Sequence, residues 1–191
     1  LEHPGRLLNS ILLLFCLLSS CEMAKSSPSL IASADTLQLV NKKGLMYFNG
    51  VPFSGKLFKL EVKSGDTLFV ENYLKGLKHG VFKRFYPNNI LYEKRSYEMG
   101  DKEGVHLGYW DNGHLAFQYH LEDNLYHGSL KSWNKQGQII KFLNYSRGQP
   151  LGQQQLWEDN GSVRTNYVIK NNRRYGLLGT KNCINVSDSI F

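Results

Sequence analysis

The chain has 191 residues, a length that predicts one folded domain with room for an appended tail. Aromatic residues make up 13% and charged residues 20% of it, and the mean hydropathy is -0.38, which argues against a disordered chain and against a polytopic membrane protein. The net charge of +7 favours anionic partners, although solubility alone also accounts for such a balance. The 18 glycines, with many β-branched and aromatic residues, predict turns and strands rather than long helices.

The first 20 residues have the pattern of a secretory signal peptide. Arg6 precedes a mostly apolar run at 7–18, which is shorter than the roughly 20 residues of a membrane-spanning helix. The segment Leu18-Ser19-Ser20-Cys21 resembles the lipobox of bacterial lipoproteins. The resemblance implies that the chain is cut before Cys21 and that a lipid on the Cys21 thiol holds it to a membrane. We therefore expect a protein of the bacterial cell envelope that faces the periplasm or the exterior, with a plain secreted protein as the alternative.

Residues 21–44 are expected to form a lipid-anchored tether and the start of a cap. The segment 22–34 is rich in serine and has no hydrophobic periodicity, so no structure is predicted for it. Cys183 is the only cysteine beyond the first 21 residues, which excludes a disulfide framework in the body of the protein. We expect Cys183 to be a structural thiol rather than a reactive one.

A repeat of 24 residues dominates the rest of the chain. One glycine recurs at this spacing without exception, at Gly80, Gly104, Gly128, Gly152 and Gly176. A Gly or Asn stands four residues before it each time, at Gly76, Gly100, Asn124, Gly148 and Asn172. Because Gly and Asn adopt positive φ most easily, this second column is predicted to form a turn in every repeat.

Other columns keep the same phase. One is aromatic, at Phe85, Tyr109, Trp133 and Trp157, and one is aliphatic, at Leu91, Leu115, Ile139 and Val163. A third column holds Tyr97, Leu121, Tyr145 and Ile169. Its even spacing from the aliphatic column places the two on one face of a strand. We expect the aromatic and the aliphatic columns to point inward.

Hairpin turn signals lie between the aromatic and the aliphatic column of each repeat. They are the pairs Asn88-Asn89, Asn112-Gly113, Gln136-Gly137 and Asn160-Gly161. Each repeat is therefore predicted to be one β-hairpin that lengthens the sheet by about 10 Å. The predicted fold is all-β, an elongated antiparallel meander of tandem hairpins over residues 45–176, with an irregular first repeat and a C-terminal cap or tail at 177–191.

The spacing Tyr73-x-x-Gly76-x-x-x-Gly80-x-x-x-x-Phe85-Tyr86-x-Asn88 and its successors resemble a variant of the MORN repeat. The same pattern is similar to bacterial proteins labelled YwqK-type antitoxins of toxin-antitoxin systems. The resemblance covers residues 45 to about 176. It implies stacked β-hairpins and a role in protein interaction or at a membrane, and it implies no catalytic residues.

Side chains that could carry chemistry do not form a recognisable motif. The sequence has no nucleophile elbow, no phosphate-binding loop and no dinucleotide-binding turn, so we expect no enzyme and no cofactor. His79 and His127 occupy the same repeat position, which favours a place beside a turn over a metal site, and no metal is expected. Nucleic acid is not expected as a partner, because an exported protein seldom meets it.

Three functions remain open from the sequence. The first is a non-enzymatic, lipid-anchored envelope protein whose hairpin array binds a protein partner. The second is binding of cell-wall or other envelope polysaccharide through exposed rings. The candidate rings lie outside the columns expected to point inward, and they are Tyr86, Tyr92, Trp110 and Tyr126. The third is antitoxin-like binding of a toxin. Rings exposed in neighbouring rows would favour polysaccharide, and rings packed under the tail or the tether would favour the protein partner.

Overall fold

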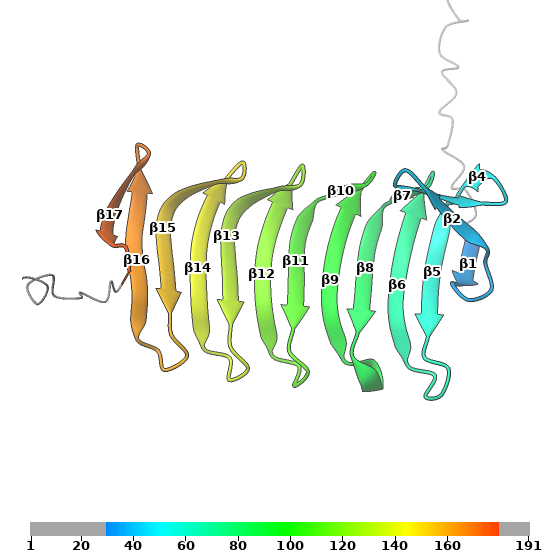
Figure 1. Cartoon of the computed structure of the whole chain (residues 1–191), viewed down its shortest axis with the longest axis horizontal. Coiled ribbons are helices and arrows are strands. Elements are labelled where there is room, and N and C mark those ends of the chain that lie inside the picture. Colours follow the sequence, from blue (N-terminus) through cyan, green and yellow to red (C-terminus); the bar gives the residue numbers. More distant parts are fainter. Residues whose placement is uncertain (1–29, 180–191) are drawn as a thin grey trace, which may run out of the picture.

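The computed structural model describes residues 30–179 of the chain (Figure 1). Within that range the fold is all-β, as the sequence predicts, apart from one 3₁₀ turn at Pro87–Asn89. The strands are β1 (Leu30–Ser33), β2 (Leu39–Lys42), β3 (Leu45–Phe48), β4 (Val51–Pro52), β5 (Gly55–Leu60), β6 (Thr67–Leu74), β7 (Leu77–Lys78), β8 (Gly80–Phe85), β9 (Leu91–Glu98), β10 (Asp101–Lys102), β11 (Gly104–Tyr109), β12 (Leu115–Glu122), β13 (Leu125–Trp133), β14 (Ile139–Ser146), β15 (Gln149–Trp157), β16 (Val163–Lys170) and β17 (Arg173–Leu177). The expected signal peptide, Cys21 and Cys183 lie outside the described residues.

The strands form one large sheet and one small one. The large sheet has 14 strands in the order β1-β5-β6-β8-β9-β11-β12-β13-β14-β15-β16-β17, with the short β7 and β10 beside β6 and β9. All its pairs are antiparallel except β1 with β5. The small sheet, β2-β3-β4, lies at the N-terminal end of the array (Figure 1). The elongated hairpin meander predicted from the repeat is therefore confirmed.

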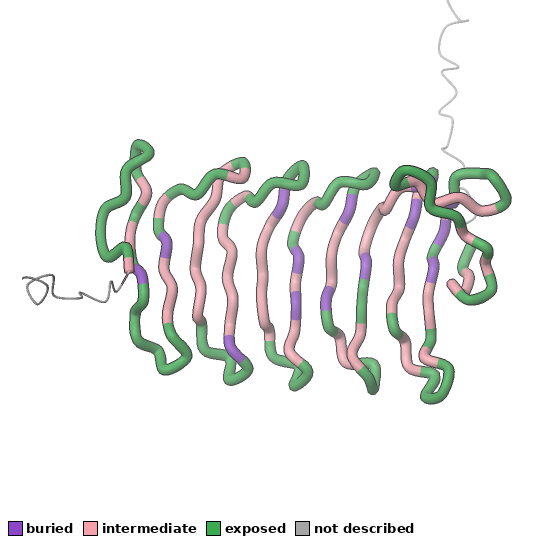
Figure 2. The backbone as a smooth tube through the Cα atoms, viewed as in Figure 1, coloured by how far each residue is buried: buried purple, intermediate pink, exposed green. Residues whose placement is uncertain are grey.

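The large sheet is a single layer over most of its length: among residues 30–179 no helix covers either face, and the small sheet packs against it only at the N-terminal end (Figure 1). Most of the chain is accordingly half-buried or exposed (Figure 2). The expectation that the aromatic and the aliphatic columns point into an interior is therefore wrong. The aromatic column from Phe85 to Trp157 is only half-buried, and Ile139 and Val163 are exposed. A single layer has no interior, so side chains can bury surface only against neighbours on the same face.

Along one long side of the sheet, the strand ends are joined by tight two-residue hairpin turns at the predicted turn column; we call this side the tight-turn edge. The two central residues of each turn have positive φ, which defines a type I′ turn. The pairs are Lys75-Gly76, Met99-Gly100, Asp123-Asn124, Arg147-Gly148 and Asn171-Asn172. The glycine four residues later also has positive φ, for example 80° at Gly80 and 73° at Gly104. Around it the register of the strand pair shifts, as between Tyr119 and Leu121, so this glycine belongs to a β-bulge.

Along the opposite long side, the strand ends are joined by wider loops at the predicted Asn-Gly positions; we call this side the wide-loop edge. In the loop around Asn112, the Gly113 N–H donates to the Trp110 carbonyl at 2.9 Å and the Trp110 N–H donates to the His114 carbonyl at 2.8 Å. Gly113 has a φ of 83°. These features define a three-residue loop, a type I turn followed by a bulge residue, rather than a two-residue turn. The 3₁₀ turn takes this place in the first full repeat.

Tight turns also tie neighbouring repeats together. The N–H of the turn Gly or Asn donates to a carbonyl of the preceding repeat at 2.7 to 3.1 Å, in the pairs Gly76 to Phe53, Gly100 to Lys78, Asn124 to Lys102 and Gly148 to Tyr126. Two residues that precede the repeat glycine accept from the next turn: His79 from the Met99 N–H at 3.4 Å and Glu103 from the Asp123 N–H at 3.0 Å. His79 thus lies beside a turn and helps to hold the next repeat.

The two ends of the array differ. Residues 30–42, expected to be tether and the start of a cap, contain β1 and β2, and β1 covers the N-terminal edge of the sheet by pairing with β5. The apolar residues Leu30 and Ile31 permit this strand despite the serine-rich segment before them. At the other end β17 is the last described strand, and all five of its residues are exposed. The described residues contain no helix long and apolar enough to cross a bilayer.

Candidate recognition surface

One face of the large sheet carries a continuous row of rings, which we call the aromatic ladder. Neighbouring ring centroids are 4.8 to 6.0 Å apart along the row. The ladder comprises Phe53, Tyr73, Phe82, Tyr97, His106, Tyr119, Tyr126 and Tyr145, with Phe117 stacked on Tyr119 at 5.3 Å. The sheet face that holds it is called the ladder face. Each such ring pair contributes about 0.5–1.5 kcal/mol beyond its area burial.

The repeat explains why each long strand from β6 to β14 supplies a ring. The Tyr column contributes Tyr73, Tyr97 and Tyr145 from the second strand of successive hairpins. The first strand contributes Phe82 and His106, which stand 24 residues apart. In the register of β8 and β9, Tyr97 lies opposite Gly80 and Phe82 lies opposite Arg95, so the two rings are diagonal neighbours on the same face.

His106 is the ladder member with the least solvent contact, at 0% exposure. Its Nε2–H donates to the Ser96 carbonyl at 2.9 Å, while Nδ1 is buried and has no partner. Burial lowers the pKa of His106, because the imidazolium form would lose its hydration there. The same repeat position holds Gln154, which donates to the Asn144 carbonyl at 2.8 Å. A neutral donor is thus the common feature of the two polar residues in this column.

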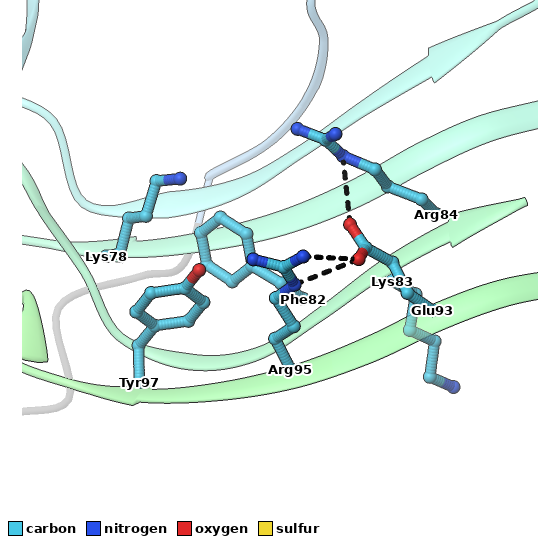
Figure 3. Close-up of a pocket in the computed structure, with 7 residues that line it drawn as sticks. All are labelled: Lys78, Phe82, Lys83, Arg84, Glu93, Arg95 and Tyr97. Atoms are coloured by element: carbon cyan, nitrogen blue, oxygen red, sulfur yellow. Dashed lines mark hydrogen bonds and ion pairs between the residues drawn. The ribbon is translucent and has the colours of Figure 1, made fainter. Parts of the chain in front are cut away.

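A cluster of charged side chains lies on the ladder face beside Phe82 and Tyr97 (Figure 3). Glu93, only 6% exposed, accepts from Arg95 Nε at 2.9 Å and lies 2.7 Å from Arg95 Nη2. The Arg84 Nε atom lies 3.6 Å from the other Glu93 oxygen. The Glu93 carboxylate and its hydrogen bonds hold the pKa of Arg95 above its usual value, although burial acts in the opposite direction. We call this group the Arg–Glu–Arg cluster.

The four candidate rings from the sequence do not form one surface. Tyr86, Tyr92 and Trp110 lie at the wide-loop edge, where the rings of Tyr86 and Tyr92 are 4.9 Å apart. The Tyr86 hydroxyl donates to the Tyr109 carbonyl at 3.2 Å and Trp110 Nε1 donates to the Trp133 carbonyl at 3.0 Å, so both link neighbouring repeats. Tyr126 lies at the tight-turn edge and belongs to the ladder. Tyr92 and Tyr126 are exposed, at 40% and 37%.

Trp110 lines an open cleft of about 730 Å³ at the wide-loop edge. The other lining residues are mostly amides and charged groups: Asn134, Lys135, Gln136, Gln138, Ile140 and Asp159. The Lys135 Nζ atom lies 5.8 Å from the centre of the Trp110 ring and 3.0 Å from an Asp111 oxygen. A tryptophan with amide groups around it is a composition that suits a polar, ring-shaped ligand such as a sugar.

The sequence missed the Arg–Glu–Arg cluster and the amides of the cleft. Arg84, Glu93 and Arg95 do not recur at the 24-residue spacing, so the repeat gave no signal for them. The only available signal was their placement: Glu93 and Arg95 lie two residues apart on β9, and Arg84 lies directly opposite Glu93 on β8. Within residues 30–179 no group of three or more His, Cys, Asp or Glu side chains is arranged to hold a metal ion.

Comparisons of the chain with protein-family models, with curated proteins and with solved structures find no match. The function is therefore inferred from the geometry described above.

Proposed function

We propose that this chain is a non-catalytic recognition protein of the bacterial envelope, built from MORN-like repeats, and that its ladder face binds an acidic protein partner. The observation that carries the proposal is the aromatic ladder on a single-layer sheet. Its C-terminal rings, Tyr119, Tyr126 and Tyr145, retain solvent contact, and aromatic residues are the type most enriched in protein interfaces. A lipid on Cys21 would hold the ladder face near a membrane, so the partner is expected there.

Charge supports an acidic partner. Strand registers place seven basic side chains on the ladder face: Lys59, Lys78, Arg84, Arg95, Lys102, Lys141 and Arg174. The same strands place two acidic side chains there, Glu71 and Glu93. An acidic segment laid along the ladder, across the strands, would meet cations and rings, and complementary charge would speed its association.

Capture from detergent-solubilised envelopes tests the proposal. The full chain, the ladder variant Tyr126→Ala and the control variant Tyr175→Ala are compared as baits. Tyr175 is 54% exposed and lies on the opposite face, so it matches Tyr126 in type and accessibility. We expect Tyr126→Ala to reduce recovery of the partner at least tenfold and Tyr175→Ala to leave it unchanged. Equal recovery with both variants would contradict binding at the ladder. A toxin among the captured proteins would support the antitoxin-like alternative.

The cleft beside Trp110 favours a second function, binding of envelope polysaccharide. Its volume and its amide-rich lining are the specific support. Pulldown on insoluble cell-wall polysaccharide tests it, with Trp110→Ala and Gln136→Ala in the cleft and Tyr92→Ala outside the cleft as the control. Loss of retention in both cleft variants, with the control retained as wild type, would support sugar binding. Retention unchanged in all three variants would exclude this cleft.

A further inference from the structure

The Arg–Glu–Arg cluster encloses a small cavity over the Phe82 ring (Figure 3). Its volume is about 70 Å³, enough for about five waters at 10–15 Å³ each or for one oxyanion of similar size. The guanidinium groups of Arg84 and Arg95, the Lys78 ammonium and the Tyr97 hydroxyl surround this space, whereas Lys83 points away from it (Figure 3).

The three cations of the cavity are held to different degrees. The buried Glu93 carboxylate pairs closely with the Arg95 guanidinium, and its other oxygen lies 3.6 Å from Arg84 Nε. Lys78 Nζ lies 4.9 Å from the centre of the Phe82 ring and 5.3 Å from that of Tyr97. It has no carboxylate within 4.0 Å among the described residues. The Arg95 guanidinium is therefore preorganised for an anion, and Lys78 is left without a competing carboxylate.

Positive charge exceeds negative charge in the cavity. Three cations, Lys78, Arg84 and Arg95, face one carboxylate, that of Glu93, which leaves an excess of +2. Glu71 on the next strand does not line the cavity, and its carboxylate accepts from the Tyr73 hydroxyl at 2.8 Å. The Arg84 side chain is 57% exposed, so a ligand can reach the guanidinium from solvent.

We infer that this cavity binds one oxyanion group, a carboxylate or a phosphate, of a ligand that lies on the ladder face. Arg84 and Arg95 donate charge-assisted hydrogen bonds, Lys78 supplies a third positive charge, and the Tyr97 hydroxyl donates from the tight-turn side. The inference deepens the proposed function, on which it rests for the nature of the partner, but small anions test the cavity without that partner.

Titration of the full chain in a non-ionic detergent provides the test. Sodium phosphate and sodium acetate are added at constant ionic strength, with sodium chloride as the control, and the Arg side-chain Nε resonances are followed by NMR. We expect saturable shifts for Arg84 and Arg95, with a Kd of about 1 mM for the better anion, as a few charge-assisted contacts give. Tighter binding of phosphate identifies a phosphate group as the natural ligand, and equal or tighter binding of acetate identifies a carboxylate.

Two variants on one strand separate a site from a general effect of charge. Arg84→Gln should weaken anion binding at least tenfold, whereas Lys83→Gln, which removes the same charge from the opposite face, should leave the Kd unchanged. Thermal unfolding of both variants confirms that each is folded. Shifts that do not saturate, that chloride reproduces, or that both variants reduce equally would overturn the inference. Failure of partner capture together with saturable anion binding would overturn the proposed function and leave the oxyanion site standing.

Discussion

The repeat column that supplies Phe82 to the ladder also accepts polar side chains, and those that occur there donate to a neighbouring carbonyl. In the repeat column that contains Phe82, the polar members are His106 and Gln154, and each donates to a carbonyl of the preceding strand. Residue pairs 48 positions apart thus make equivalent hydrogen bonds, His106 with Ser96 and Gln154 with Asn144. The side-chain donor gives each carbonyl a hydrogen bond that an aliphatic residue could not supply, and the Ser96 carbonyl also accepts from the Glu103 N–H at 3.1 Å.

The neutral state of His106 makes stability depend on pH. Its pKa in the folded chain is lower than the usual 6.5, so between the two values the unfolded chain binds the proton more readily. The free energy of unfolding should therefore decrease as pH falls through 6.5, and stop decreasing from this source below the folded pKa. Urea unfolding at pH 7.5 and 5.5 measures the change, and His106→Gln should remove part of it. An identical pH dependence in the variant would show that other groups cause the effect.

A neighbouring ring, rather than the backbone conformation, requires glycine at position 108. It has no positive φ, but a methyl group at this position would overlap the Phe117 ring, which lies across it from the next strand. Gly108→Ala should destabilise the protein by about 1–3 kcal/mol through this overpacking. In a double-mutant cycle measured by urea unfolding, Phe117→Leu should relieve most of the added cost. Additive costs would mean that the ring moves aside freely.

At the scale of the element, the two edges of the sheet use glycine for different reasons. Gly113, in a wide loop, has a φ of 83° and no atom within 4 Å of an added methyl group. Gly76, in a tight turn, has a similar φ of 82°, but its added methyl group would meet the Met46 carbonyl oxygen at 2.9 Å. The wide loops are thus constrained by the backbone alone, and the first tight turn also by its neighbours.

Substitutions at Gly113 should separate these causes. Gly113→Val should cost about 1–3 kcal/mol, because a β-branched residue resists positive φ although space is available. Gly113→Asn should cost clearly less, since Asn tolerates this conformation. Both values come from urea unfolding. Equal costs would contradict an origin in φ and point to an unrecognised contact of the loop.

The hairpins were predictable because their signals are local. A turn needs Gly or Asn at fixed positions, and Gly76 and Asn112-Gly113 indicate the turns from a few neighbouring residues. The single layer was not predictable, because Val70 and Phe142 place apolar side chains on the face opposite the ladder, so the pattern suggests burial on both faces. The pairing of β1 with β5 is also non-local. The Arg–Glu–Arg cluster depends on register between two strands, which the columns alone do not reveal.

At the scale of the whole molecule, burial is concentrated near the N-terminal end. The main cluster of buried apolar residues consists of Phe53, Leu57, Tyr73, Phe82 and Tyr97, and residues of the small sheet such as Met46 and Phe48 pack against it. The C-terminal strands β16 and β17 expose Val168, Tyr175 and Leu177 instead. In an array whose units contact only their neighbours, local stability follows local burial, so it should decline from β5 toward β17.

Native-state hydrogen exchange of wild type and Leu57→Ala tests this decline. In wild type the amides of β5 to β9 should exchange most slowly and those of β16 and β17 fastest, because opening the far end exposes little apolar surface. Leu57 is buried in the main cluster, so Leu57→Ala should lower the opening free energy of β5 and β6 by about 2–4 kcal/mol. The amides of β16 should keep their wild-type rates, since eight strands separate β5 from β16 in the sheet order and Leu57 packs within the N-terminal cluster. If the exchange rates of the β16 amides rise as much as those of β5, the array unfolds as one cooperative unit and the exposed C-terminal strands depend for their stability on the N-terminal cluster.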